Sequence, residues 1–432
     1  MRLSRATLND AAPVVRRPDP RVLAAGCGVA HLGVGAFSRA HQGVFIEDAM
    51  EQAGGDFAVI GVSMRKPDVA DALAEQNGLY TVETLAAQPS YRVMGLLRHT
   101  LTLPLSPAEV TAVLASPRKK LITLTVTEKG YCLAGEALDF DHPDIKADLA
   151  DPQSPKSAIG ALVAGLALRR AHGAPVTVIS CDNLMDNGRR LRGAVLALAE
   201  RRDPELARWI EAEIAFPDTM VDCIVPASDA AHRGRVEAAL GLEDHASVQR
   251  EPFAEWVIEN RFAADRPALE AVDVELVEDV SAARRLKLHV LNAAHSTLAY
   301  LGLPRGHVYV RDAAADAELM GFVAAMMREE VAPALPGLPV LAYWDKTAAR
   351  FANPAIAHRL DQIAEDGAFK LAQRIYPLLT ANRREGRPHA RLIQAARAYL
   401  RWTAPGDRIA QAATLPVAVA ADAGLAEELL AS

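Results

Sequence analysis

The sequence has little cysteine and none of the cysteine spacings that bind zinc. Its 432 residues include four cysteines. These are Cys27, Cys132, Cys181 and Cys223, and no two of them form a C-x-x-C pair. Cysteines this far apart fit neither a zinc site nor a disulfide framework. We therefore expect free thiols in a reducing compartment and no bound metal.

A basic surface is also lacking. The formal net charge is −7, whereas proteins that bind nucleic acid present a face rich in lysine and arginine. We therefore expect no nucleic-acid partner. An anionic small molecule stays compatible with this charge, because a pocket can be locally basic inside an acidic protein.

Long apolar runs are absent as well. No run reaches the roughly 18 uninterrupted apolar residues of a membrane span. The N-terminal stretch MRLSRATLNDAAPVVRRPDP has no apolar core of the kind found in signal peptides. We therefore predict a cytoplasmic protein without a membrane partner. Coiled-coil heptads are missing too, so a monomer and a homodimer are equally compatible with the sequence.

What the sequence does contain is an alternation of strand and helix patterns. Strand patterns occupy residues 29–35, where the strand runs into glycines, and 57–62, 120–127 and 175–181, and residues 80–84 look extended. Helix patterns occupy 38–53, 68–77 and 155–172. This alternation predicts an α/β fold with a parallel sheet covered by helices on both faces. The first 28 residues are expected to form an arm. From Ser281 onward the spacing is helical with almost no strand pattern, which predicts a mainly α-helical C-terminal domain.

A glycine turn, Gly33-x-Gly35, lies between the first strand and the first helix. This is the context of a dinucleotide fingerprint, in which glycines allow a tight turn and a close approach of the pyrophosphate to the backbone. Ser38 stands where the third glycine is usual, and a purely structural turn is the alternative.

The nearest acid after the second strand is Asp68, which would hold the ribose hydroxyls of NAD. Arg65 and Lys66 would instead favour the 2′-phosphate of NADP, or they are solvated loop charges. We expect NAD, with NADP as the alternative.

The segment from Arg285 to Gly302 carries an unusual set of polar residues on an apolar helix pattern. At about 100° per residue, Lys287, Asn292 and His295 fall within roughly 140° of the helix circumference. A desolvated lysine can act as a general base, an asparagine amide can donate to a developing alkoxide, and a histidine can orient a hydroxyl. The alternative is a structural helix with a snorkelling lysine and a core histidine.

These features resemble the long-chain mannitol dehydrogenase family of polyol and uronate oxidoreductases. The matching stretches occur in family order. They are HLGVGAFSRAHQ (31–42), TLTVTEKGY (123–131), SCDNLMDNG (180–188), FPDTMVDCIVP (216–226), EPFAEWVIENRF (251–262), KLHVLNAAH (287–295) and RFANPAIAHRLDQIAEDGAFKLAQR (350–374).

The resemblance implies a dinucleotide-binding Rossmann-type domain over 1–275 and a helical substrate-binding and catalytic domain over 276–432. It also implies chemistry with NAD or NADP and without zinc. The cofactor turn would be formed by Gly33, Gly35 and Phe37. The resemblance assigns Lys287 the role of general base, and Asn183 and Asn292 form the pair that stabilises the oxyanion. It assigns His295 the positioning of the substrate. Asp222 corresponds to an acid that tunes proton transfer by the lysine.

Some carried-over roles have structural alternatives, and the chain departs from the family in places. Asn183 could cap the turn after its strand, and Asp222 could be a salt-bridge partner. Cys223 replaces an expected arginine, and Asn260 stands where an acid is common. The C-terminal part is also shorter than we expect of the family.

The substrate is expected to be a sugar acid. The stretch DGAFKLAQR (366–374) is similar to the DGSQKLPQR pattern of the fructuronate reductase branch, with Ala368 in place of the serine. Lys370 and Arg374 lie four residues apart and could bind a carboxylate together, or form a solvated helix face. We therefore favour D-mannonate and D-fructuronate as substrate and product. The alternatives are a neutral polyol such as mannitol or arabinitol, and an inactive nucleotide-binding regulator.

Overall fold

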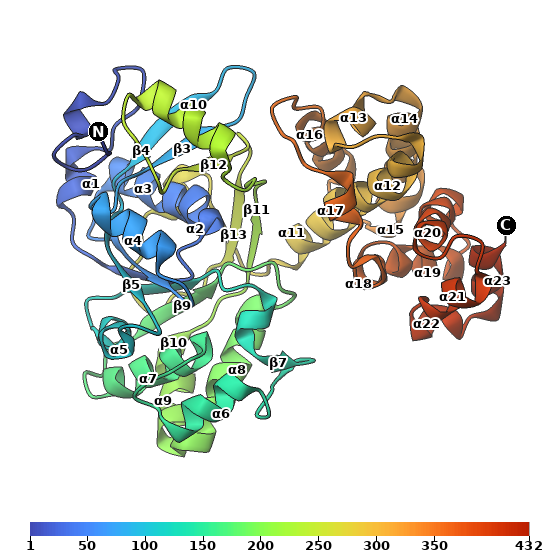
Figure 1. The fold of residues 1–432 in the computed structure, drawn as a ribbon. Coiled ribbons are helices and arrows are strands. Elements are labelled where there is room, and N and C mark those ends of the chain that lie inside the picture. Colours follow the sequence, from blue (N-terminus) through green and yellow to red (C-terminus); the bar gives the residue numbers. More distant parts are fainter. Residues whose placement is uncertain (432) are drawn as a thin grey trace. The chain divides into compact units, whose positions relative to one another are not determined.

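A computed structural model describes residues 1–431 of the chain (Figure 1). The chain divides into two compact units, Met1–Val280 and Ser281–Ser432. In Figure 1 unit 1 runs from blue to yellow and unit 2 from yellow to red. No helix within residues 1–431 is both long and apolar enough to cross a membrane.

Unit 1 is built on a six-stranded parallel sheet with the strand order β10-β9-β6-β1-β2-β5. Its strands are β1 (Val29–Leu32), β2 (Val59–Ser63), β5 (Leu97–Thr102), β6 (Leu121–Leu124), β9 (Val176–Ser180) and β10 (Ile214–Ala215). Strand β1 pairs with β2 on one side and with β6 on the other. The strand order therefore reverses at β1, and at such a switch point the carboxyl ends of the strands open onto a ligand crevice.

Helices cover both faces of this sheet, as the sequence predicted. The covering helices are α2 (Ala36–Ala40), α3 (Gln42–Ala53), α4 (Asp68–Glu75), α5 (Pro107–Ala115), α6 (Pro143–Ala150), α7 (Ala158–Arg170), α8 (Asn187–Arg202) and α9 (Pro204–Glu213). Alternate strand residues face different cores. Leu32 and Ile122 pack with α5, α7 and α8, whereas Val29 and Leu121 pack with α3. Burial on both faces explains why these strands are almost wholly apolar.

Besides a two-stranded sheet of β7 (Leu133–Ala134) and β8 (Ala137–Leu138), unit 1 contains two three-stranded sheets that the sequence analysis described only in part. One has the order β12-β3-β4 and the other β11-β13-β14. Their strands are β3 (Tyr80–Thr84), β4 (Ser90–Met94), β11 (Thr219–Asp222), β12 (Val248–Arg250), β13 (Glu255–Glu259) and β14 (Glu275–Val277). The pairs β3–β4 and β11–β13 are antiparallel. Of these strands only Tyr80–Thr84 stood out as extended in the sequence.

The prediction of an N-terminal arm is wrong. Residues Leu3, Leu8 and Val15 are buried in a cluster with Val93 of β4 and Leu240. The segment contains α1 (Pro20–Ala24) and packs against α10 (Ala230–Leu240) and β4. Apolar residues spaced irregularly along a proline-containing segment give no helix or strand period, which is why the sequence did not reveal this packing.

Unit 2 is helical, and residues 281–431 contain no strand. Its elements are α11 (Ser281–Leu286), the π-helical segment η4 (Lys287–Asn292), α12 (Ala293–Gly302), α13 (Val310–Ala315), α14 (Ala317–Met326), η6 (Met327–Val331), α15 (Ala332–Ala334), α16 (Val340–Phe351), α17 (Leu360–Ala364), α18 (Gly367–Arg374), α19 (Tyr376–Arg384), α20 (Ala390–Thr403), α21 (Arg408–Ala413), α22 (Val417–Ala420) and α23 (Ala423–Leu430). Residues 293–300 of α12 are all buried, so this helix is the axis around which the others pack.

Candidate active site

The glycine turn lies directly after β1, at the switch point of the sheet. Gly33 has a φ of +93°, and a Cβ at this residue would lie 2.1 Å from the carbonyl oxygen of Thr125. Only glycine fits there. Gly35 is exposed and directly precedes α2 as its N-cap residue, and a Cβ on it would have no neighbour closer than 3.7 Å. The backbone at Gly35 is therefore open to a ligand from outside, as the approach of a dinucleotide pyrophosphate requires.

The carbonyl groups of this turn are bonded inside the protein. The carbonyl oxygen of Gly33 accepts a hydrogen bond from Thr125 Oγ1 at 2.7 Å and one from His31 Nε2 at 3.1 Å. The carbonyl oxygen of Gly35 accepts from Ser38 Oγ and from Arg39 Nε, each at 3.1 Å. Ser38 thus replaces the usual third glycine with a residue that ties the turn. The donors on these oxygens reduce their repulsion of a phosphate at the turn.

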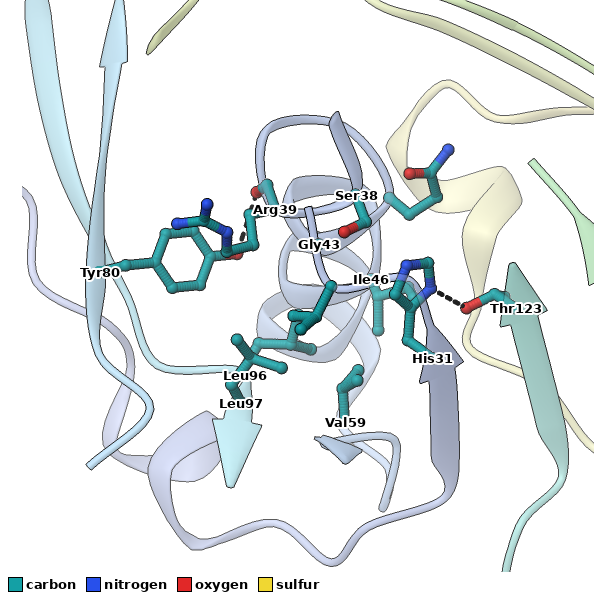
Figure 2. Close-up of a pocket in the computed structure, with 12 residues that line it drawn as sticks. His31, Ser38, Arg39, Gly43, Ile46, Val59, Tyr80, Leu96, Leu97 and Thr123 are labelled. Atoms are coloured by element: carbon teal, nitrogen blue, oxygen red, sulfur yellow. Dashed lines mark hydrogen bonds between the residues drawn. The ribbon is translucent and has the colours of Figure 1, made fainter. Parts of the chain in front are cut away.

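His31 lies on β1 beside Thr123 of β6, as Figure 2 shows. His31 Nε2 lies 3.1 Å from the carbonyl oxygen of Gly33, which can only accept, so the imidazole proton is on Nε2 and Nδ1 accepts from the Thr123 hydroxyl at 2.7 Å. Burial lowers the pKa of His31 to about 4. The ring is therefore neutral at physiological pH, and its donor direction is set by the Gly33 carbonyl.

A small cavity lies under the turn (Figure 2). Its volume is about 20 Å³, which is enough for one water molecule. His31, Gln42 and Tyr80 contribute polar atoms to a lining that is otherwise mostly apolar. Neither Nε2 nor Oε1 of Gln42 has a hydrogen-bond partner within residues 1–431. The position and size of this space suit a buried water that completes the turn rather than a substrate.

The other residues predicted to bind the cofactor lie at the surface of unit 1. Phe37 is half-buried in α2 and stacks on His41, with ring centroids 4.9 Å apart. Arg65 follows β2 and is exposed, and Asp68 is the exposed first residue of α4. Arg65 and Asp68 both lie beyond the carboxyl end of the strand next to β1, where a Rossmann-type sheet meets the adenosine ribose.

Two residues that the sequence analysis did not single out organise the carboxyl ends of β6 and β9. The carboxylate of Asp182 accepts hydrogen bonds from the backbone N–H groups of Val126 and Thr127 and from the Tyr131 hydroxyl, at 3.0, 2.9 and 2.7 Å. Thr127 has a φ of +65°. Strand β6 therefore ends at Leu124, and the prediction of a strand through Thr127 is wrong.

Asn187 ties the loop after β9 to β11. Its Nδ2 donates to the Thr219 hydroxyl at 3.0 Å, and its Oδ1 accepts from the Thr219 N–H at 2.9 Å. Asn183, which is exposed, belongs to this loop, and Asp222, which is buried, ends β11. The hydrogen bonds of Asn187 thus hold the backbone segment that carries Asn183 next to the strand that carries Asp222. Asp182, in the loop after β9, and Asn187, the first residue of α8, gave no periodic pattern that sequence analysis could use.

In unit 2 the predicted catalytic segment is helical, with one departure from the expected geometry. Residues Lys287–Asn292 form a π-helical segment, η4, within the continuous helix from α11 to α12. In an α-helix, residues five apart are separated by roughly 140° around the axis. In a π-helix the hydrogen bonds span five residues, so Lys287 and Asn292 come closer to one face. Single π-helical turns of this kind are frequent at functional sites.

His295 follows one turn later on α12 and is buried. Its ring contacts that of Phe351, with centroids 4.4 Å apart. Burial, together with the nearby His358, Arg350 and Arg374, lowers the pKa of His295 well below its usual value. The ring is therefore neutral and can either donate or accept a hydrogen bond.

Lys370 and Arg374 both lie on α18, as the sequence predicted. Arg374 reaches the catalytic segment, where its Nη1 donates to Ser296 Oγ at 3.0 Å and to the carbonyl oxygen of Asn292 at 3.4 Å. Burial lowers the pKa of Arg374 to about 10. Lys370 Nζ donates to the carbonyl oxygen of Ile363 at 3.2 Å, and burial lowers its pKa. Because Arg374 points toward α12 and is hydrogen-bonded there, it is not part of a solvated helix face, which was the alternative interpretation of these two residues.

One grouping of metal-ligating residue types occurs within residues 1–431. Ligand atoms of Cys132, His142 and Asp144 lie within 4.8 Å of one another. However, His142 Nδ1 accepts the backbone N–H of Asp144 at 3.2 Å and so caps α6. Burial raises the pKa of the Cys132 thiol to about 11. A thiol that resists ionisation and a capping histidine make this a poor metal site.

Comparison with known proteins agrees with this architecture. Residues 27–271 match the mannitol dehydrogenase Rossmann domain, and residues 279–425 match the mannitol dehydrogenase C-terminal domain. The uncharacterized oxidoreductase YeiQ of Escherichia coli K12 is 41% identical over 355 residues, covering 80% of this chain and 73% of the relative. The D-mannonate oxidoreductase of the same strain is 37% identical over 386 residues, covering 87% and 79%.

Solved structures give the same result. The Pseudomonas fluorescens mannitol 2-dehydrogenase, solved as a ternary complex with NAD and D-mannitol, superposes with a TM-score of 0.88 at 32% identity. The match covers 100% of this chain and 96% of that structure. The chain therefore belongs to the mannitol dehydrogenase family of oxidoreductases, which act on CH–OH groups with NAD(P).

Proposed function

We propose that the chain is an NAD-dependent dehydrogenase that interconverts D-mannonate and D-fructuronate. The observation that carries this proposal is the position of Arg374, whose guanidinium lies against the helix of Lys287, Asn292 and His295. Its acceptors there are a carbonyl oxygen and a hydroxyl, both neutral. A largely buried cation beside neutral acceptors gains most from an anionic ligand. The similarity to a D-mannonate oxidoreductase supports the same substrate.

The catalytic roles follow from the chemistry of the side chains. In oxidation, Lys287 Nζ accepts the proton of the substrate hydroxyl, and in reduction it returns that proton. The amides of Asn183 and Asn292 donate hydrogen bonds to the substrate oxygen as negative charge develops. His295 positions a neighbouring hydroxyl, and Asp222 tunes proton transfer by the lysine. When bound, the nicotinamide supplies the hydride acceptor in oxidation and the hydride in reduction.

The cofactor is held by unit 1 in this proposal. Gly33, Gly35 and Phe37 form the turn that binds the pyrophosphate of the cofactor, and the open backbone at Gly35 leaves room for that group. Asp68 binds the ribose hydroxyls of NAD, and this makes NAD the preferred cofactor. Arg65 is the residue that would instead favour the phosphate of NADP. From its sequence we expect the enzyme to work in the cytoplasm, with a small molecule as its substrate partner.

A neutral polyol such as mannitol or arabinitol is the second candidate substrate, and the similarity to mannitol 2-dehydrogenase favours it. An inactive nucleotide-binding regulator is the least supported alternative, because Lys287, Asn183, Asn292 and His295 are all present.

The deciding experiment follows NADH oxidation with fructuronate and with fructose, each repeated with NADPH. Turnover of fructuronate with NADH, and little turnover of fructose, is the expected result. Turnover of fructose alone would assign the chain to neutral polyols and overturn the proposed substrate. NADH binding without turnover across a panel of ketoses and uronates would favour the regulator. Activity should persist after treatment with EDTA, because no step in the proposal uses a metal.

A further inference from the structure

His358, which has no role in the mechanism above, lies next to the catalytic segment of unit 2. It precedes α17, where Tyr309 and Arg359 form an isolated antiparallel bridge. The N–H of Val310 donates to the carbonyl oxygen of His358 at 2.9 Å. Arg359 is exposed and pairs with Asp361. Because side chains alternate along extended backbone, His358 faces the other way, toward the interior.

There the ring of His358 meets the ring of His295. Their centroids are 5.3 Å apart, and the planes are inclined at 76°. His358 Nδ1 and His295 Nε2 are both buried, and neither has a hydrogen-bond partner within residues 1–431. Buried polar atoms in native proteins are almost always bonded, so two adjacent exceptions call for an explanation. A ligand that bonds both nitrogens would supply it.

The charges around the two rings identify the kind of ligand. Burial lowers the pKa of His358, and the charge of Lys370 lowers it further. Burial, the other ring, Arg350 and Arg374 lower the pKa of His295 in the same way. No carboxylate contributes to either shift within the described part of the chain. Two neutral imidazoles close to lysine and arginine, with no described carboxylate acting on either ring, form a surface suited to an anion. The nearby acids Glu365 and Asp366 act on Lys370 instead.

We propose that His358 joins Lys370 and Arg374 in binding the terminal carboxylate of the substrate, and so determines the preference for sugar acids over neutral sugars. The inference rests on the proposed function and names the group that recognises this substrate class. The imidazole N–H of His358 donates to one carboxylate oxygen and Lys370 Nζ to the other. A neutral hydroxymethyl group at the same end would gain no attraction from the lysine charge.

The test compares two ketoses that differ at this end, fructuronate with a carboxylate and fructose with a hydroxymethyl group. In His358→Phe, which keeps an aromatic ring against His295, kcat/KM for fructuronate should fall about tenfold to hundredfold. In the same variant, kcat/KM for fructose should change by less than about threefold. His358→Asn keeps an N–H donor and should recover part of the fructuronate activity. The matched control is His307→Gln, which alters a histidine paired with Asp316 and should change neither value.

The outcomes separate the inference from the proposed function. A wild-type enzyme that does not reduce fructuronate would overturn both. If the wild type reduces fructuronate but His358→Phe leaves its kcat/KM unchanged, only the role of His358 is wrong. Equal losses with both sugars, not recovered by asparagine, would assign His358 a structural role. The NADH dissociation constant of each variant should equal that of the wild type, which verifies that the variant is folded.

Discussion

His31 in unit 1 and the pair His295 and His358 in unit 2 differ in how their buried ring nitrogens are satisfied. In unit 1 both nitrogens of His31 are bonded, to Thr123, Thr125 and the carbonyl of Gly33. In unit 2 His295 and His358 each keep a buried nitrogen without a partner. The bonded nitrogens of His31 help to hold the backbone of the glycine turn, where the cofactor is proposed to bind. The arrangement in unit 2 leaves hydrogen-bonding capacity for a ligand. Unbonded ring nitrogens also occur in unit 1, at His232, but its Nε2 lies 3.7 Å from a carboxylate oxygen of Glu83. By contrast, no carboxylate within residues 1–431 lowers or raises the pKa of His295 or His358.

The largest expected effect is that of Lys287→Ala in unit 2. If this lysine exchanges the substrate proton, kcat should fall by about 100-fold or more, the scale of acid–base catalysis. NADH binding should stay unchanged, because the turn of Gly33 and Gly35 is untouched. Steady-state kinetics and a fluorescence titration with NADH measure the two quantities. The control is Lys346→Ala, an exposed lysine on α16, and near-wild-type turnover in Lys287→Ala would refute the assignment.

A smaller effect is expected when the His31 scaffold of unit 1 is titrated. Burial holds the pKa of His31 near 4, below its usual 6.5. Its contribution to stability is therefore complete above pH 6.5 and declines as the pH falls toward 4. Between pH 7 and pH 5 the loss should be about 2 kcal/mol.

His31→Gln, which cannot take up the proton, isolates this contribution. Urea unfolding of wild type and variant at the two pH values should show a shallower pH dependence in the variant. Equal pH dependence in both proteins would mean that His31 is not the neutral, bonded group described above.

The smallest expected effect concerns the glycine turn itself. In Gly33→Ala the new Cβ would meet the Thr125 carbonyl, so the turn must shift, and the NADH dissociation constant should rise by about tenfold. Gly234→Ala is the matched control, because a Cβ at Gly234 in α10 has no neighbour within 4 Å. An unchanged affinity in Gly33→Ala would place the cofactor elsewhere on unit 1.

The sequence was a good guide where the fold depends on local periodicity. Apolar strands such as Leu121–Leu124 alternate with helices, and this predicted the parallel sheet and the helices on its two faces. The family resemblance rested on short motifs in the correct order and is confirmed by the comparisons. The glycine turn was located correctly because Gly33 and Gly35 directly follow a strand.

The sequence was a poor guide where geometry depends on contacts distant along the chain. Thr127 carries a strand-forming side chain, but Asp182, far along the sequence, bonds its N–H and ends the strand early. Leu3 and Val15 belong to a cluster completed by Leu240. His358 lies in a loop without periodicity. Its ring contact with His295 depends on how α12 packs against the loop that ends in the bridge at Arg359, and no local pattern reveals that packing.

The π-helical segment η4 has a consequence for the whole helix from Ser281 to Gly302. A turn closed by longer hydrogen bonds holds one residue more than the α-helical turn it replaces. The segment is therefore a phase shift, which offsets the faces of α11 and α12 by about 100°. If the same residues were wound as a regular α-helix, Lys287 and Asn292 would instead lie about 140° apart around the axis. The alignment of base and amide is thus encoded by how many residues one turn contains.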